Sequence, residues 1–311
     1  QARGVEDALH KALLANNVSI RLNSVAEKLL INPNGLCEGV LLSDGESLRA
    51  DAVIIATGGL SYPSTGSTGD GYTFAKAVGH TLLNTSPALV PLETAETWPG
   101  FLSGLSLKNV RLDAFDCQHK KRFFSETGEM LLTHFGISGP LVLTMSSILP
   151  ADVRGIPVQI DMKPALSESE LDARILRDIA SAPNKCMNTI MDGLAPHRLG
   201  AQILVLAGIS DSLPTNALKA KDRHRLVSFL KGIPLTLSAR RSYAEAIITR
   251  GGINTKEISP STMGSKKIGG LYFAGEVLDL DASTGGYNMQ IAFSTGALAG
   301  ASAARYVLKK A

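Results

Sequence analysis

The chain has 311 residues, of which 44% are hydrophobic and 19% are charged, and its formal net charge is +3. It is long enough for two compact domains, and no apolar run reaches the roughly 18 residues of a membrane span. So small a net charge gives no reason to expect a nucleic-acid partner. Cys37, Cys117 and Cys186 form no CxxC pair, which argues against a metal site or a redox disulfide. The polar opening residues contain no apolar signal-peptide core, so we expect a cytoplasmic protein.

The first 85 residues are typical of part of an α/β domain. Residues 5–16 carry apolar side chains at helical spacing, which predicts an amphipathic helix. Residues 52–56 (AVIIA) form a continuous apolar run, as in buried parallel strands, and Thr57, Gly58 and Gly59 follow directly. Glycines at the carboxyl end of such a strand are typical of ligand sites in open α/β sheets. Shorter strands are predicted at residues 18–22, 26–31 and 39–43.

The pattern changes after about residue 85 and again near residue 236. Residues 86–165 contain short β-like runs separated by Gly and Pro, which predicts a small antiparallel barrel or sandwich. Residues 166–236 show helical periodicity. We therefore expect an α/β domain, formed by 1–85 and 237–311, that is interrupted by a β-barrel-like insertion and a helical subdomain. The strands expected in the insertion include residues 110–115, 130–133, 141–145 and 158–162.

Residues 271–290 (LYFAGEVLDLDASTGGYNMQ) carry the strongest functional signal. An apolar run typical of a buried strand ends at Gly275 and Glu276, and Gly285 and Gly286 lead into a predicted helix over about 288–308. Glycine lets a backbone approach a cofactor closely, and a helix N-terminus directs partial positive charge towards an electron-rich ring. The segment predicts a dinucleotide cofactor, and a flavin in particular. The many small residues of the helix fit either close approach to that cofactor or tight helix packing alone.

Six sequence blocks, spread along the chain in order, resemble one family. They are ATGGLSYPSTGSTGDGY (56–72), THFGISGP (133–140), TRGGI (249–253), STMGSK (261–266), GLYFAGEVLDLD (270–281) and GGYNMQ (285–290). Together they resemble the HI0933-like family of bacterial FAD-dependent oxidoreductases, which includes aminoacetone-oxidase-like and bile-acid-reductase-like flavoproteins. The resemblance implies a Rossmann-like FAD-binding α/β domain interrupted by a β-barrel and a helical subdomain, which agrees with the changes of pattern.

The resemblance also implies positions for the cofactor. The backbone around Val25 would contact the adenine, and the remaining positions would border the pyrophosphate, the ribityl chain and the isoalloxazine ring. These remaining positions are Thr57, Gly58, Gly59, Gly275, Glu276, Asp281, Gly286, Asn288, Met289 and Gln290.

One family feature has no counterpart in the first 30 residues. The family opens with a strand and a GxGxxG-type turn that binds pyrophosphate, whereas Gly4 is the only glycine in residues 1–30. We therefore expect the chain to be a piece of a longer FAD enzyme, and the piece need not bind FAD itself. A missing first strand would leave an apolar sheet edge open, and we expect self-association through it.

Two side chains are candidate proton donors. His134 lies in a Gly-rich segment, although a histidine in such a place is more often a hydrogen-bonding residue that fixes a loop. Tyr287 follows the predicted flavin-binding glycines and could donate a proton to the substrate, or it could pack over the ring. The flavin carries out the redox chemistry, so the protein mainly supplies orientation and electrostatics.

The leading interpretation is an FAD-dependent oxidoreductase of a small organic substrate, with NAD(P)H as a possible electron donor and an enone-like compound or oxygen as acceptor. The main alternative is a non-catalytic module, in which the insertion serves as an interaction domain. A third interpretation is a relative of the FAD-dependent tRNA-modifying enzymes, and the weakly basic composition argues against it.

Overall fold

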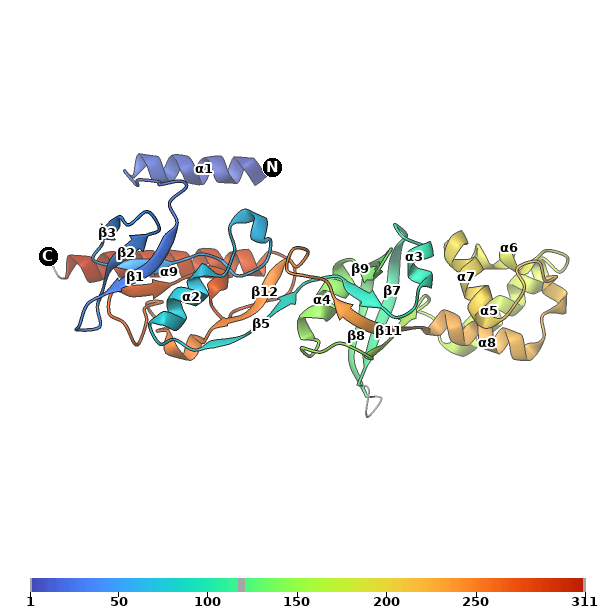
Figure 1. Ribbon diagram of the computed structural model, residues 1–311. Helices are drawn as coiled ribbons and strands as arrows, with labels where there is room; N and C mark the ends of the chain where they lie inside the picture. Colours follow the sequence, from blue (N-terminus) through green and yellow to red (C-terminus); the bar gives the residue numbers. More distant parts are fainter. Residues whose placement is uncertain (1, 117–120, 310–311) are drawn as a thin grey trace.

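The computed structural model describes residues 2–116 and 121–309, and three parts follow one another along its length (Figure 1). The α/β part (residues 2–88 and 248–309) holds both ends of the chain. The barrel (92–162 and 233–240) lies in the middle, and the helical part (163–232) lies at the opposite end. This architecture confirms the predicted fold class, an α/β domain interrupted by a barrel and helices.

Two short parallel strands form the centre of the α/β part. β4 (Val53–Ile55) pairs with β13 (Leu271–Phe273), and their side chains share one hydrophobic cluster with α2 (Asp70–Ala77) and α9 (Tyr287–Leu308). Among the described residues, β4 has a ladder partner on one edge only, and Ile54 is 39% exposed. Self-association through this open edge stays a prediction.

Two antiparallel sheets complete the α/β part. β5 (Leu82–Ala88) pairs with β12 (Ile248–Ile253), while the N-terminal helix α1 (Ala2–Ala15) lies apart from the body (Figure 1). The strand predicted at residues 18–22 is wrong: this segment is irregular and exposed, and among the described residues no strand pairs with it. The second sheet contains β1 (Ala26–Ile31), β2 (Cys37–Leu42) and β3 (Ser47–Arg49).

Six strands close into the barrel, in the order β10–β11–β6–β9–β8–β7. The strand predicted at residues 141–145 is wrong, because these residues belong to helix α4 (Pro140–Ile148). Pro140 occupies the first helical turn, where its missing N–H costs no hydrogen bond, and a short buried apolar run does not by itself distinguish a helix from a strand. Cys117 lies outside the described residues. The barrel elements are β6 (Leu92–Thr94), α3 (Trp98–Phe101), β7 (Ser106–Phe115), β8 (Arg122–Thr133), β9 (Gly136–Ser138), β10 (Pro157–Asp161) and β11 (Ile233–Arg240).

The helical part packs on the barrel through a common hydrophobic core. Buried side chains of the barrel and of the helices belong to one continuous cluster, which is separate from the cluster of the α/β part. Ser167 and Glu170 form a capping box that starts the first of these helices. The helices are α5 (Glu168–Ser181), α6 (Met187–Met191), α7 (His197–Ala207) and α8 (Ala220–Lys231).

A buried carboxylate joins the barrel to α8, the last helix of the helical part. Asp161, at the end of β10, is fully buried and lies 3.0 Å from Arg111 of β7 and 2.7 Å from Lys231 of α8. Removing the carboxylate leaves Lys231 without its buried partner, whereas Arg111 keeps an ion pair with Asp113 at 3.1 Å. Loss of a buried partner of this kind is strongly destabilising.

We predict that Asp161→Ala lowers the free energy of unfolding by about 3 kcal/mol, because Arg111 and Lys231 lose their shared carboxylate. Urea denaturation followed by circular dichroism measures this change. Asp178→Ala removes a looser ion pair with Arg174, at 3.7 Å and partly exposed, and should change stability little. Equal losses from both variants would contradict the assigned role of Asp161.

Candidate functional site

Three segments of the α/β part meet at the carboxyl ends of β4 and β13. Glu276, in the short turn η4 (Gly275–Val277), accepts a 2.8 Å hydrogen bond at Oε1 from the backbone N–H of Thr249 in β12. The Thr249 hydroxyl oxygen accepts hydrogen bonds from the N–H groups of Leu60 (2.7 Å) and Ser61 (3.0 Å). The loops that follow both parallel strands are thus tied to one residue of β12.

Gly59 is required by this junction. A Cβ added at Gly59 would lie 2.6 Å from the Thr249 Cβ and 2.7 Å from Glu276 Oε1, and closer still to the Thr249 hydroxyl. Real Cβ atoms do not approach other atoms so closely, so any side chain here would displace the carboxylate. The structure therefore brings together two of the predicted cofactor residues, Gly59 and Glu276.

The start of α9 is held by two side chains. Asn288 Oδ1 accepts a 2.8 Å hydrogen bond from the N–H of Ala282, and its Nδ2 donates to the Ala282 carbonyl at 2.8 Å. Thr295 Oγ1 accepts a 2.9 Å hydrogen bond from the N–H of Gly275. Asn288 therefore fixes the acidic loop against the helix, and Thr295 fixes α9 against the turn that carries Glu276.

Three glycines along the first half of α9 and the turn beside it have open space next to their backbone. A Cβ at Gly286 or Gly296 would meet no described atom within 4 Å, and one at Gly275 would meet only the Ala292 Cβ, at 3.9 Å. Tyr287 is 63% exposed and Met289 61% exposed. The N-terminal end of a 22-residue helix also offers partial positive charge to an anionic ring. These open positions fit the group that the sequence predicts.

The acidic loop beyond η4 carries carboxyls with shifted pKa values. Burial raises the pKa of Glu276, and the hydrogen bonds from Thr249 only partly oppose this. Burial also raises the pKa of Asp281, which Arg250 opposes and Asp279 reinforces. The loop therefore favours a ligand that presents hydroxyl groups rather than further negative charge.

The other predicted site residues are dispersed. The Thr57 hydroxyl is buried with no hydrogen-bond partner among the described residues, and Gly58 takes a left-handed conformation with φ 74°. Val25 is 59% exposed and holds the β2–β3 turn through its carbonyl. Gln290 donates to Ser294 at 2.9 Å, along the exposed side of α9. Their contacts with a cofactor stay predictions.

His134 lies apart from this group. It belongs to the turn between β8 and β9 in the barrel, where its ring meets the Phe135 ring edge to face at 4.9 Å and its carbonyl lies against Gly100 of α3. These contacts agree with a loop-fixing histidine. A catalytic role for His134 stays a prediction.

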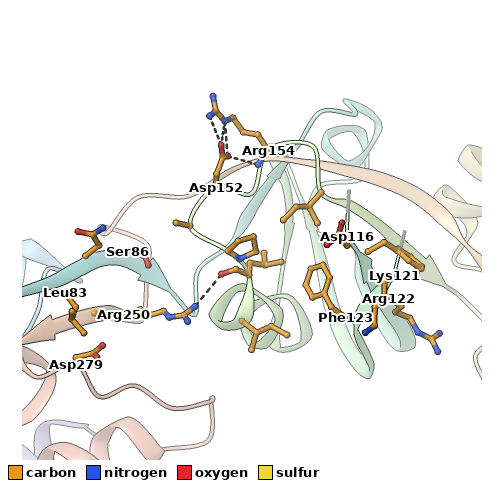
Figure 2. Close-up of a pocket in the computed structure, with 18 residues that line it drawn as sticks. Leu83, Ser86, Asp116, Lys121, Arg122, Phe123, Asp152, Arg154, Arg250 and Asp279 are labelled. Carbon is orange, nitrogen blue, oxygen red and sulfur yellow. Dashed lines mark hydrogen bonds and ion pairs between the residues drawn. The ribbon is translucent and has the colours of Figure 1, made fainter. Parts of the chain in front are cut away.

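A cavity of about 1,040 Å³ lies between the α/β part and the barrel (Figure 2). Leu83, Arg250 and Asp279 line it from the α/β part, and Phe123 and Arg122 from the barrel. Asp279 is three residues beyond Glu276, so the cavity adjoins the predicted cofactor loop. Its walls combine apolar side chains with seven charged residues, so it could hold an organic ligand that also presents polar groups.

Arg250 links the two walls of this cavity. Its Nη1 donates a 2.8 Å hydrogen bond to the carbonyl of Ser147 in the last turn of α4. Arg240 donates to Ser146, Leu149 and Pro150 at the same helix end, at 2.8–3.1 Å. Both cations neutralise the partial negative charge of a helix C-terminus, which fixes α4 beside the cavity.

Two site residues were not predicted from the sequence. Thr249 appeared only as a letter in the TRGGI block, and Thr295 only as one of many small residues in the last helix. Each acts through a single hydroxyl that receives backbone N–H groups from a segment distant in the sequence. No spacing pattern in one sequence reveals such a contact.

Among the described residues, no helix is long and apolar enough to cross a membrane. Within the same ranges, no cluster of three or more His, Cys, Asp or Glu side chains is placed to hold a metal ion.

Comparison with known proteins identifies the family. The model of the HI0933-like protein Rossmann domain matches residues 1–302. The chain is 32% identical over 309 residues to a 3-dehydro-bile acid delta(4,6)-reductase of Clostridium scindens, which covers 98% of this chain and 74% of that protein. It is 35% identical over 259 residues to a ribosomal RNA dihydrouridine synthase of Haemophilus influenzae, and this match covers 82% of this chain and 61% of that protein. It is 30% identical over 294 residues to a ribosomal RNA dihydrouridine synthase of Escherichia coli, and this match covers 94% of this chain and 70% of that protein.

The α/β fold, with its glycine-bearing loops beside a helix N-terminus, defines the class as a Rossmann-type flavoprotein oxidoreductase. Because the family match covers nearly the whole chain, the protein belongs to the HI0933-like family of FAD-dependent oxidoreductases.

We predict that Gly59→Ala disrupts the junction of Glu276 and Thr249, because the new Cβ would overlap both residues. The melting temperature should fall by several degrees, as expected for overpacking of about 1–3 kcal/mol. Gly300→Ala is the control, since its Cβ would meet no described atom within 4 Å in a helix; it should be neutral or stabilising. Differential scanning calorimetry compares the two, and an unchanged Gly59→Ala would refute the packing argument.

We also predict a pH dependence that belongs to Glu276. Because burial raises its pKa in the folded state, the unfolded chain loses this proton first as pH rises above the ordinary value of 4.5. The contribution of Glu276 to stability therefore decreases with rising pH through this range. Glu276→Gln should remove that decrease. Urea unfolding between about pH 4 and pH 7 measures it, and parallel stability curves for both proteins would contradict the prediction.

Proposed function

We propose that this chain, with FAD bound at the open end of α9, contributes to the reduction of a carbon–carbon double bond conjugated to a carbonyl group. The observation that carries the proposal is the large cavity beside the cofactor loop, whose walls combine apolar and charged side chains. The names of the relatives support the reaction class. A 3-dehydro, delta(4,6) bile acid is a conjugated ketone, and conversion of uridine to dihydrouridine saturates a double bond conjugated to a ring carbonyl.

Each part of the site has a proposed task. Gly275, Glu276 and Thr295 would hold the turn beside the ribityl chain, and Asn288 would fix the loop at the ring edge. When bound and reduced by two electrons, the flavin would supply hydride to the carbon β to the carbonyl, and a proton would then reach the α carbon. NAD(P)H is the proposed source of the two electrons. The cavity would hold the rest of the substrate.

Tyr287 is the better placed of the two candidate proton donors. It begins α9 next to Gly286, and it is 63% exposed. His134 lies in a barrel turn away from this helix end, and neither residue is among the described lining residues of the cavity. We assign the proton transfer to Tyr287 because it adjoins the glycines proposed to border the ring.

Two substrates fit this reaction class. A small organic enone is the first, in line with the Clostridium relative, which matches 98% of the chain. A uracil base within ribosomal RNA is the second, because two relatives are named for that reaction. Both substrates present the same conjugated carbonyl group, so the proposed chemistry at the flavin ring does not distinguish between them.

We predict that Tyr287→Phe lowers kcat by about 100-fold, the usual contribution of a positioned general acid, and leaves the Kd for FAD unchanged. The assay titrates FAD by fluorescence quenching, then follows NADPH oxidation with a steroid enone as acceptor. Glu276→Ala should instead weaken FAD binding, because it frees the turn that carries Gly275. If the chain binds no FAD, the proposal fails. If Tyr287→Phe turns over normally, the role assigned to Tyr287 fails.

A further inference from the structure

A second hollow lies between the barrel and the helical part, at the opposite end of the barrel from the α/β part (Figure 1). It consists of two adjoining cavities of about 700 Å³ and 290 Å³, which share Lys108, Met162 and Lys163 in their walls. We call the two together the distal groove. The reaction proposed above does not use it.

The distal groove is lined by cations. Lys108, Lys163 and Arg174 line the larger cavity, and no acidic residue is among the described residues of its wall. The smaller cavity contains one acid, Asp192, which is paired with His197 at 2.7 Å. Arg174 has one distant carboxylate neighbour, Asp178 at 3.7 Å, and donates to the Gly193 carbonyl at 2.9 Å.

Local backbone structure places these cations. The pairing of β7 with β8 shifts register between Leu107 and Val110, so Lys108 and Asn109 form a bulge, with Asn109 at φ 54°. A bulge redirects side chains out of the sheet. The backbone of Lys163 is held on both sides, since its N–H donates to Asp161 at 2.8 Å and its carbonyl accepts from Lys231 at 2.9 Å.

Two of the cations of the groove, Lys163 and Arg174, lie close enough to repel one another. Partial burial lowers the pKa of Lys163, and the nearby charge of Arg174 lowers it further. The charge of Lys163 is therefore less stable here than in water, and a bound anion beside it would offset both the burial and the repulsion. Lysine and arginine side chains around a concave surface are also the usual contacts of phosphate oxygens.

From these observations we propose that the distal groove binds backbone phosphates of an RNA strand. The groove lies where the barrel meets the helical part, and the cavity lies where the barrel meets the α/β part. A ligand that contacts both must therefore be extended, which a steroid-sized molecule is not, and the cationic wall of the groove favours a polyanion. The choice of RNA over other polyanions rests on the second substrate of the proposed function, for which two relatives are named.

The test measures RNA binding without turnover. A fluorescein-labelled single-stranded RNA of about 16 nucleotides is titrated with the full chain at several salt concentrations, and anisotropy gives the affinity. The groove variant is Lys108→Gln/Lys163→Gln/Arg174→Gln. The control variant, Lys28→Gln/Lys76→Gln/Lys256→Gln, loses the same three charges at exposed positions of the α/β part. A second groove variant keeps Arg174, in case its bond to Gly193 is needed for folding.

We expect the groove variant to reduce the slope of log affinity against log salt by about 2, since each phosphate contact on a single strand contributes about 0.7. The control variant should keep the slope of the parent chain. Equal slopes for groove and control variants, or no RNA binding by the parent at low salt, would overturn the proposal. Displacement of RNA by inorganic phosphate at equal phosphate concentration would show a site for free phosphate instead, and would also overturn it. Because no reduction is measured, failure here leaves the reductase proposal intact.

Discussion

The site depends on one partly buried contact, the hydrogen bond from the Thr249 backbone to the Glu276 carboxylate. A carboxylate is costly to bury unless hydrogen bonds replace its water. The contact therefore exists only where β12 can reach the turn after β13, and Gly59 must leave the space open. Through the Thr249 hydroxyl, the same residue also holds the loop after β4. Three segments far apart in the sequence are thus held in fixed positions relative to one another. The loops proposed to bind the cofactor belong to these segments, so their positions are fixed as well.

Much of the α/β part could be predicted, because its central strands are apolar runs ending in glycine and its last helix follows a glycine pair. Patterns within short windows carry that information. The barrel helix α4 and the irregular segment at 18–22 were predicted wrongly as strands, since apolar composition alone does not choose between hydrogen-bond partners. Thr249 and Thr295 were missed because their roles depend on contacts with residues distant in the sequence. Thr249 accepts a hydrogen bond from Leu60, and Thr295 accepts one from Gly275.

The net charge of a chain sums over all its residues and does not show where the charges lie in the fold. A value of +3 gives no sign of a cationic surface, yet the fold gathers Lys108, Lys163 and Arg174 from β7, the loop after β10 and α5 into one groove. A carboxylate close to Lys163 in the sequence, Asp161, is already shared by Arg111 and Lys231. The local charge of a surface therefore depends on which carboxylates already form ion pairs elsewhere in the fold. Amino-acid composition does not contain that information.

The separation of the two hydrophobic cores has a mechanical consequence. The barrel and the helical part share one core and should move as a single body, whereas the α/β part has its own. The two parts are joined by the chain crossings from β5 to β6 and from β11 to β12, and by the arginine bonds to the end of α4 (Figure 1). A small apolar contact also joins them, in which Leu143 of α4 packs against Ala88, Leu89 and Ile248. The walls of the cavity belong to parts with separate large cores, so a rotation of one part against the other would change the width of the cavity without breaking either large core.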